Sequence, residues 1–209
     1  MEILGGNRLI NFRLYAITDQ SSCYPTPLLE QIQYLLDLGV PAIQLREKEL
    51  SDEDFRRLAD LTQRMMVDYP THFFINSRWQ LAAKMRVDGV HLPAQLTNQI
   101  RIAKSAGLLV GSSAHNLAEA QQQAAEGADF ITYSPIFPTS SKPGHTVGLY
   151  ALAQVSGMID IPVFALGGIK PRNIVSCQRV GAFGVAVMSG MMGDQLVIQS
   201  YLKEMENFG

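Results

Sequence analysis

The sequence predicts an α/β protein of the (β/α)8 TIM-barrel class, and three observations lead to this prediction. Eight short runs of β-branched and aliphatic residues alternate with longer amphipathic segments along the whole chain. Three of these segments end in a Gly, at Gly39, Gly127 and Gly181, as helices that close with a left-handed residue commonly do. Eight units exceed the about five or six strands of a doubly wound sheet, and they fit a barrel.

Each predicted strand is short and is followed by a predicted helix. The strands are expected at residues 14–18, 42–46, 72–76, 89–93, 109–113, 130–137, 162–168 and 184–190. The helices are expected at residues 27–39, 52–66, 79–86, 98–107, 117–128, 149–158, 172–182 and 194–208. Ser51 and Asp54 resemble a capping box at the start of the second helix. In a barrel of this kind the active site lies at the C-terminal ends of the strands.

The composition indicates one domain that acts on a small molecule. With 47% hydrophobic residues among 209, we expect a single domain over residues 1–209, with the barrel itself at about 14–208. The net charge of −2 and the lack of a dense Lys/Arg run argue against nucleic acid and membrane partners. The N-terminus lacks a signal-peptide pattern, so we expect a cytoplasmic protein. Cys23 and Cys177 have neither disulfide nor zinc-site spacing.

Cationic side chains occur at the end of the second predicted strand. Gln44, Arg46 and Lys48 alternate there, so all three are expected to point to one side. Cations that face a barrel interior need an anionic partner. That partner is either a carboxylate of the protein, Asp19 or Glu47, or an oxyanion of the substrate, which we favour.

The loops after the last two predicted strands suggest a phosphate site. They contain Gly167, Gly168, Met188 and Ser189, and barrels often bind phosphate through backbone N–H groups of these two loops. Two tight turns are the alternative interpretation.

The Pro/Gly-rich segment 133–148 is a second candidate for contact with a phosphate. Its hydroxyl and cationic side chains could close over a ligand, although a solvated loop is an equal alternative. They belong to Thr139, Ser140, Ser141, Lys142 and His145.

Two histidines are candidates for proton transfer. His91 and His115 follow or end predicted strands on the side of the expected active site. A structural, hydrogen-bonding histidine is the alternative for each, and His72, at the start of a strand, is expected to contribute packing or a local hydrogen bond.

These motifs, taken together and in order, resemble those of the thiamine phosphate synthase/TenI superfamily. The resemblance runs from about residue 14 to residue 192 and includes LYAITD, QLREK, FFINSR, DGVHLP, GSSAHNLAEA, GADFITYSPIFPTSSK, PVFALGGI and GVAVMSG. It implies a thiamin-pathway protein whose ligands are a thiazole phosphate and a pyrimidine diphosphate.

The resemblance also assigns site residues. Synthases of this family join the two substrates and release pyrophosphate with the assistance of Mg²⁺. Their diphosphate lies on positions that match Gln44, Arg46, Lys48, Asn76, Ser113 and Lys142. Their thiazole phosphate lies on positions that match Thr139, Ser141, Gly168 and Ser189.

Two positions depart from the synthase pattern. Family synthases carry metal-binding aspartates where this chain has Ser77 and Leu96, so no metal site is expected at these positions. TenI-type tautomerases need no metal, but their better-known members have a His where this chain has Pro135.

We therefore expect a metal-independent thiazole tautomerase without a cofactor, with His115, His91 and Lys142 as catalytic candidates. One alternative is a synthase whose Mg²⁺ is held mainly by diphosphate oxygens and water. A second alternative is a non-catalytic protein that binds thiazole or thiamin phosphate. Each of these three functions is compatible with a homo-oligomer.

Overall fold

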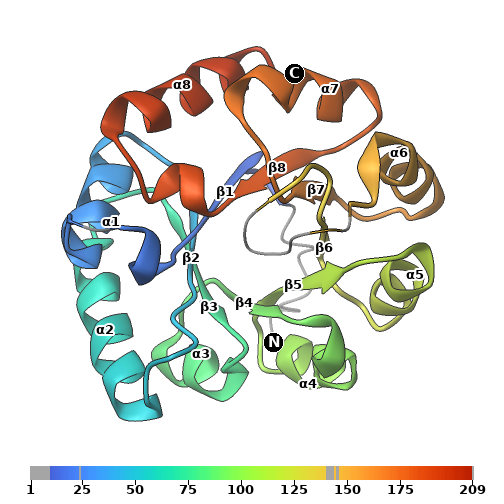
Figure 1. The fold of residues 1–209 in the computed structure, drawn as a ribbon. Helices are drawn as coiled ribbons and strands as arrows, with labels where there is room; N and C mark the ends of the chain where they lie inside the picture. Colours follow the sequence, from blue (N-terminus) through green and yellow to red (C-terminus); the bar gives the residue numbers. More distant parts are fainter. Residues whose placement is uncertain (1–9, 24, 140–143, 145, 209) are drawn as a thin grey trace.

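Eight parallel strands form a closed barrel in sequence order, with β8 paired to β1 (Figure 1). The structure is a computed structural model that describes residues 10–23, 25–139, 144 and 146–208. The strands are β1 Leu14–Ile17, β2 Ala42–Leu45, β3 His72–Asn76, β4 Gly89–Leu92, β5 Leu109–Ala114, β6 Phe130–Tyr133, β7 Val163–Leu166 and β8 Gly184–Val187. The predicted (β/α)8 class is thus confirmed.

Among the described residues, eight α-helices surround the barrel, one after each strand (Figure 1). They are α1 Leu28–Asp37, α2 Asp52–Met65, α3 Trp79–Met85, α4 Ile100–Ser105, α5 Leu117–Ala125, α6 Gly148–Met158, α7 Ile174–Arg179 and α8 Gln195–Glu206. Short 3₁₀ helices at Gln20–Ser22, Ala94–Gln99, Pro171–Asn173 and Ser189–Met191 lie in the loops that follow strands. None of the helices in the described part of the chain has the length and apolar composition of a membrane span.

Local signals in the sequence account for most element boundaries. Ser51 Oγ accepts a hydrogen bond from the Asp54 N–H at 3.1 Å, which caps α2 as predicted. Gly39, Gly127 and Gly181 adopt φ angles of 74°, 93° and 93°, which a residue with a Cβ rarely adopts. These residues end the helices that the sequence indicated.

Several strands are shorter than predicted, and the largest differences are at the strands expected at 130–137, 162–168 and 184–190, the last of which ends at Val187. The expected strand 130–137 ends at Tyr133, because Pro135 has no N–H with which to continue the ladder. The expected strand 162–168 ends at Leu166, since Gly167 and Gly168 have φ angles of 92° and 63°. In the segments 130–137 and 162–168 the strand therefore ends, and the loop at the barrel mouth begins, before the end of the apolar run.

Five aromatic rings fill the barrel on the side of the strand N-termini. Their centroids lie 5.3–6.2 Å apart, mostly in tilted or edge-to-face arrangements. They belong to Phe12, Tyr15, Phe74, Phe130 and Phe164. This packed layer fills the N-terminal side of the barrel interior, and a cavity lies toward the C-terminal ends of the strands.

Glycines on neighbouring strands make room for three of these rings. A Cβ on Gly89 would lie 2.5 Å from the Phe74 ring, and one on Gly184 would lie 2.6 Å from the Phe164 ring. A Cβ on Gly111 would lie 2.3 Å from the Phe130 ring. Large and small residues thus alternate between adjacent strands, as close packing of a barrel interior requires.

Replacing Gly89 by Ala is expected to lower the free energy of unfolding by about 1–3 kcal/mol, as overpacking of a core does. The new methyl group would lie 2.4 Å from the backbone oxygen of Leu109, which the barrel holds in place. Urea denaturation followed by circular dichroism measures the change. Gly157→Ala in α6 is the matched control, because its Cβ would meet nothing within 4 Å. Equal stabilities of the two variants would contradict this account of the core.

Candidate active site

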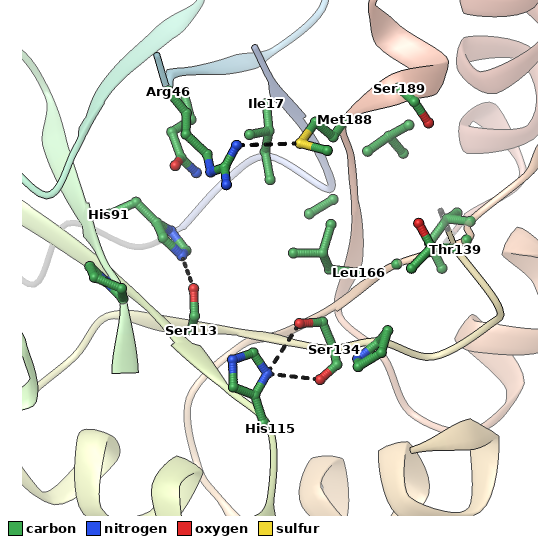
Figure 2. A pocket seen from close by; sticks show the side chains of 18 of the residues that line it. Ile17, Arg46, His91, Ser113, His115, Ser134, Thr139, Leu166, Met188 and Ser189 are labelled. Carbon is green, nitrogen blue, oxygen red and sulfur yellow. Dashed lines mark hydrogen bonds between the residues drawn. The ribbon is translucent and has the colours of Figure 1, made fainter. Parts of the chain in front are cut away.

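A cavity of about 470 Å³ lies at the C-terminal ends of the strands (Figure 2). All eight strands, or the loops directly after them, contribute to its lining. The predicted site residues that line it are Gln44, Arg46, Lys48, Asn76, His91, Ser113, His115, Thr139, Gly167, Gly168, Met188 and Ser189. Ser141 and Lys142 lie outside the described residues.

The described lining of the cavity carries positive charge only. Arg46 and Lys48 follow β2, and Lys170 follows β7. No Asp or Glu side chain is among the described residues of the lining. A cavity with cations and no carboxylate favours an anionic ligand.

The polar side chains on one wall form a directed chain of hydrogen bonds. Ser77 Oγ donates to Asn76 Oδ1 at 3.1 Å, and Asn76 Nδ2 donates to Gln44 Oε1 at 3.1 Å. Gln44 Nε2 in turn donates to the Tyr15 hydroxyl at 3.2 Å. Asn76 Nδ2 also donates to the His91 backbone oxygen at 3.3 Å, so both of its N–H groups are already engaged by the protein.

His91 is a buried and neutral histidine. Its Nε2 lies 3.0 Å from Ser113 Oγ and 3.2 Å from Thr132 Oγ1, while its Nδ1 has no partner among the described residues. Burial, together with the charge of Arg46, lowers the pKa of His91 from 6.5 to about 3. This environment favours the structural interpretation of His91 over a role in proton transfer.

His115 lies at the edge of the cavity and is held by the loop after β6 (Figure 2). Its Nδ1 is 2.9 Å from the Ser134 backbone oxygen. A carbonyl oxygen can only accept, so a neutral His115 ring carries its proton on Nδ1. Its Nε2 is then the basic nitrogen of the ring.

The Gly167-Gly168 turn packs tightly against the loop after β6. A Cβ on Gly168 would lie 2.4 Å from the Pro138 oxygen, and one on Gly167 would lie 2.7 Å from Pro135 Cβ. The Phe137 N–H donates to the Gly167 oxygen at 3.0 Å. The glycines are therefore required by the close approach of a neighbouring loop, which accounts for them independently of any ligand.

Comparison with known proteins identifies the family to which the chain belongs. The sequence model of the thiamine monophosphate synthase family matches residues 14–191. A protein of Aquifex aeolicus named putative thiamine-phosphate synthase 2 is 42% identical over 179 residues, which cover 85% of this chain and 96% of that protein. The chain belongs to the thiamine monophosphate synthase family.

Further relatives agree with this family assignment. A thiamine-phosphate synthase of Fusobacterium nucleatum is 30% identical and covers 94% of this chain and 97% of its own length. A solved structure of thiamine phosphate pyrophosphorylase from Pyrococcus furiosus has a TM-score of 0.82 at 28% identity, covering 94% of this chain and 96% of that one. The predicted family is confirmed, but these relatives are named as synthases, and none of these names supports the expected tautomerase.

The two positions at which family synthases are expected to hold Mg²⁺ do not fit that ion here. Ser77 Oγ is hydrogen-bonded to Asn76, and Leu96 packs against the hydrophobic core. Among the residues that the structure describes, no three His, Cys, Asp or Glu side chains are grouped to hold a metal. Mg²⁺ relies on carboxylate and phosphate oxygens, and this wall of the cavity offers no carboxylate.

Some residues of the lining were not predicted. Ile17 and Leu166 look like ordinary core residues in the sequence, and with the predicted Met188 they form an apolar side of the cavity (Figure 2). Lys170 follows Gly168 by two positions. A search for cations in every loop that follows a strand would have found it.

The low pKa of His91 predicts a specific dependence of stability on pH. Below pH 6.5 the unfolded chain binds a proton at His91 and the folded chain does not, down to about pH 3. The free energy of unfolding should therefore fall as the pH falls through this range. Between pH 7 and pH 5 the wild type should lose about 2 kcal/mol more than His91→Gln, which does not titrate. Urea denaturation at both pH values measures this, and parallel losses would show that His91 is not buried and neutral.

Proposed function

We propose that this protein joins a pyrimidine diphosphate to a thiazole phosphate in the cavity at the barrel mouth. The observation that carries the proposal is the set of cations, Arg46, Lys48 and Lys170, in a described lining without carboxylates. The names of the relatives support a synthase over the other candidates. Both substrates carry phosphate groups, which such a lining attracts.

The cations are distributed on two sides of the cavity. Arg46 and Lys48 after β2 lie on the side assigned to the diphosphate, with Ser113 as a hydroxyl donor. The side formed by the loops after β7 and β8 contains Lys170 and Ser189 and is assigned to the thiazole phosphate. The apolar side between them suits the two heterocyclic rings.

The coupling step transfers charge to the leaving group. The thiazole nitrogen forms a bond to the methylene carbon of the pyrimidine while the C–O bond to the diphosphate breaks. The electron pair of that bond leaves with pyrophosphate. Arg46 and Lys48 would stabilise this charge as it develops.

The absence of carboxylates at positions 77 and 96 sets an upper limit on the rate. In family synthases Mg²⁺ adds positive charge beside the diphosphate. In this chain the cationic side chains would have to stabilise the negative charge of the leaving pyrophosphate without that contribution. Loss of electrostatic stabilisation of this kind slows reactions by a factor of about 10²–10⁴. Coupling by the wild type is therefore expected to be slow.

Ser77→Asp/Leu96→Asp is expected to accelerate coupling by at least about tenfold in the presence of Mg²⁺ and to have little effect without it. Ser77 has a φ of 62°, which Asp tolerates better than most residues. The measurement is the formation of thiamine phosphate from the two substrates. Ser77→Asn/Leu96→Asn is the control with similar shape and no added charge. If neither the wild type nor the Asp variant forms product, the coupling proposal is wrong.

Isomerisation of a thiazole phosphate is the second candidate, and the geometry of His115 favours it. The bond from Nδ1 to the Ser134 oxygen places the proton of a neutral His115 on Nδ1, so Nε2 is the nitrogen that would accept a proton, and His115 lines the cavity. This reaction needs proton transfer and no metal. Of the two candidate bases, His115 is favoured over His91, because burial lowers the pKa of His91 to about 3.

His115→Gln is expected to slow any isomerisation of the carboxythiazole phosphate by about 10²-fold or more, because general bases contribute on that scale. The rate is followed by the change in the absorbance of the thiazole. His72→Gln is the control, because His72 lies at the opposite end of the barrel, at the start of β3. An unchanged rate in His115→Gln would remove His115 as the base. Binding of thiazole phosphate without turnover in either assay would select the non-catalytic alternative.

A further inference from the structure

The guanidinium of Arg46 contacts a thioether across the barrel mouth. Arg46 Nη1 lies 3.6 Å from Met188 Sδ (Figure 2). Arg46 follows β2 and Met188 follows β8, and both strands pair with β1. The contact therefore spans the end of β1, where both residues line the cavity.

Two carboxylates near Arg46 are occupied by other donors. Arg46 is close enough for its charge to act on Asp19 and Glu47, yet no ion pair joins it to either among the described residues. Asp19 accepts hydrogen bonds from the hydroxyls of Ser21 and Ser22, each at 2.7 Å.

Glu47 is engaged in the same way. It accepts a hydrogen bond from Thr18 Oγ1 at 2.6 Å and one from the Gln20 N–H at 3.0 Å. With both carboxylates satisfied locally, the guanidinium extends over the cavity instead of turning toward them.

A thioether differs from a carboxylate as a partner for Arg46. Sulfur is a weak, neutral acceptor, so it can orient one N–H of the guanidinium without neutralising its charge. The remaining N–H groups keep the planar fork that suits two phosphate oxygens at once. A carboxylate at position 188 would hold Arg46 more firmly but would cancel the charge that a ligand needs.

We infer that Met188 is a positioning residue that orients the Arg46 guanidinium for a diphosphate group. This inference rests on the proposed binding of a diphosphate on this side of the cavity. Met188 would thus strengthen ligand binding through Arg46, in addition to packing against the apolar side of the cavity.

Titration calorimetry with inorganic pyrophosphate and the full-length protein tests this role. Met188→Leu keeps the size and removes the acceptor, so pyrophosphate should bind about two- to tenfold more weakly, the range of one hydrogen bond. Met188→Gln restores an acceptor of similar length and should bind within about twofold of the wild type. A packing role predicts the reverse order, with Leu tolerated and Gln harmful. Met158→Leu, on the exposed surface of α6, is the control.

The same binding measurement in an Arg46→Met variant distinguishes a failure of the role of Met188 from a failure of the diphosphate site. There the effect of Met188→Leu should disappear, because the group that Met188 orients is gone. If Arg46→Met weakens binding but Met188→Leu does not, the inference is wrong and the diphosphate site stands. If pyrophosphate binds the wild type and Arg46→Met equally, both the diphosphate site and the role of Met188 are overturned.

Discussion

The pairing of β1 with β8 is the constraint on which the rest of this structure depends. In a closed barrel of parallel strands every strand ends at the same mouth. Residues as distant in sequence as Arg46 and Met188 therefore lie 3.6 Å apart, from Nη1 to Sδ. Loss of this closure would separate the cationic side of the cavity from the loops after β7 and β8.

The interior of the barrel divides into two layers with different physical demands. Below, aromatic rings pack against one another and against interior glycines. Above, Gln44, Asn76 and His91 are buried but hydrogen-bonded, as buried polar groups must be. Tyr15 belongs to both layers, since its ring packs with the aromatic residues and its hydroxyl accepts from Gln44. The cavity thus lies above a packed aromatic layer, and its buried polar side chains are held by hydrogen bonds.

Much of the fold and part of the site could be predicted from the sequence. Strand and helix periodicity is a local signal, and the ends of parallel strands converge by geometry alone, so polar residues at strand ends were correctly expected to line one cavity. Hydrogen-bond partners could not be predicted in this way, because they depend on the register between strands. Asn76 is an example: its donors are taken by Gln44 and the His91 backbone only because β3 lies beside β2 and β4 in this register. The different burial of His91 and His115 likewise follows from one lying inside a strand and the other beyond its end.

The hydrogen-bond chain from Ser77 to Tyr15 has a direction, and that direction bears on how such a site could change during evolution. Ser77 donates to Asn76 Oδ1, but an ionised aspartate at this position can only accept. Asn76 and then Gln44 would have to turn their amides over, and the Tyr15 hydroxyl would have to donate where it now accepts. Asn76 would also give up its bond to the His91 backbone. A carboxylate at position 77 that kept the bond to Asn76 would therefore be coupled to the orientation of three neighbouring side chains.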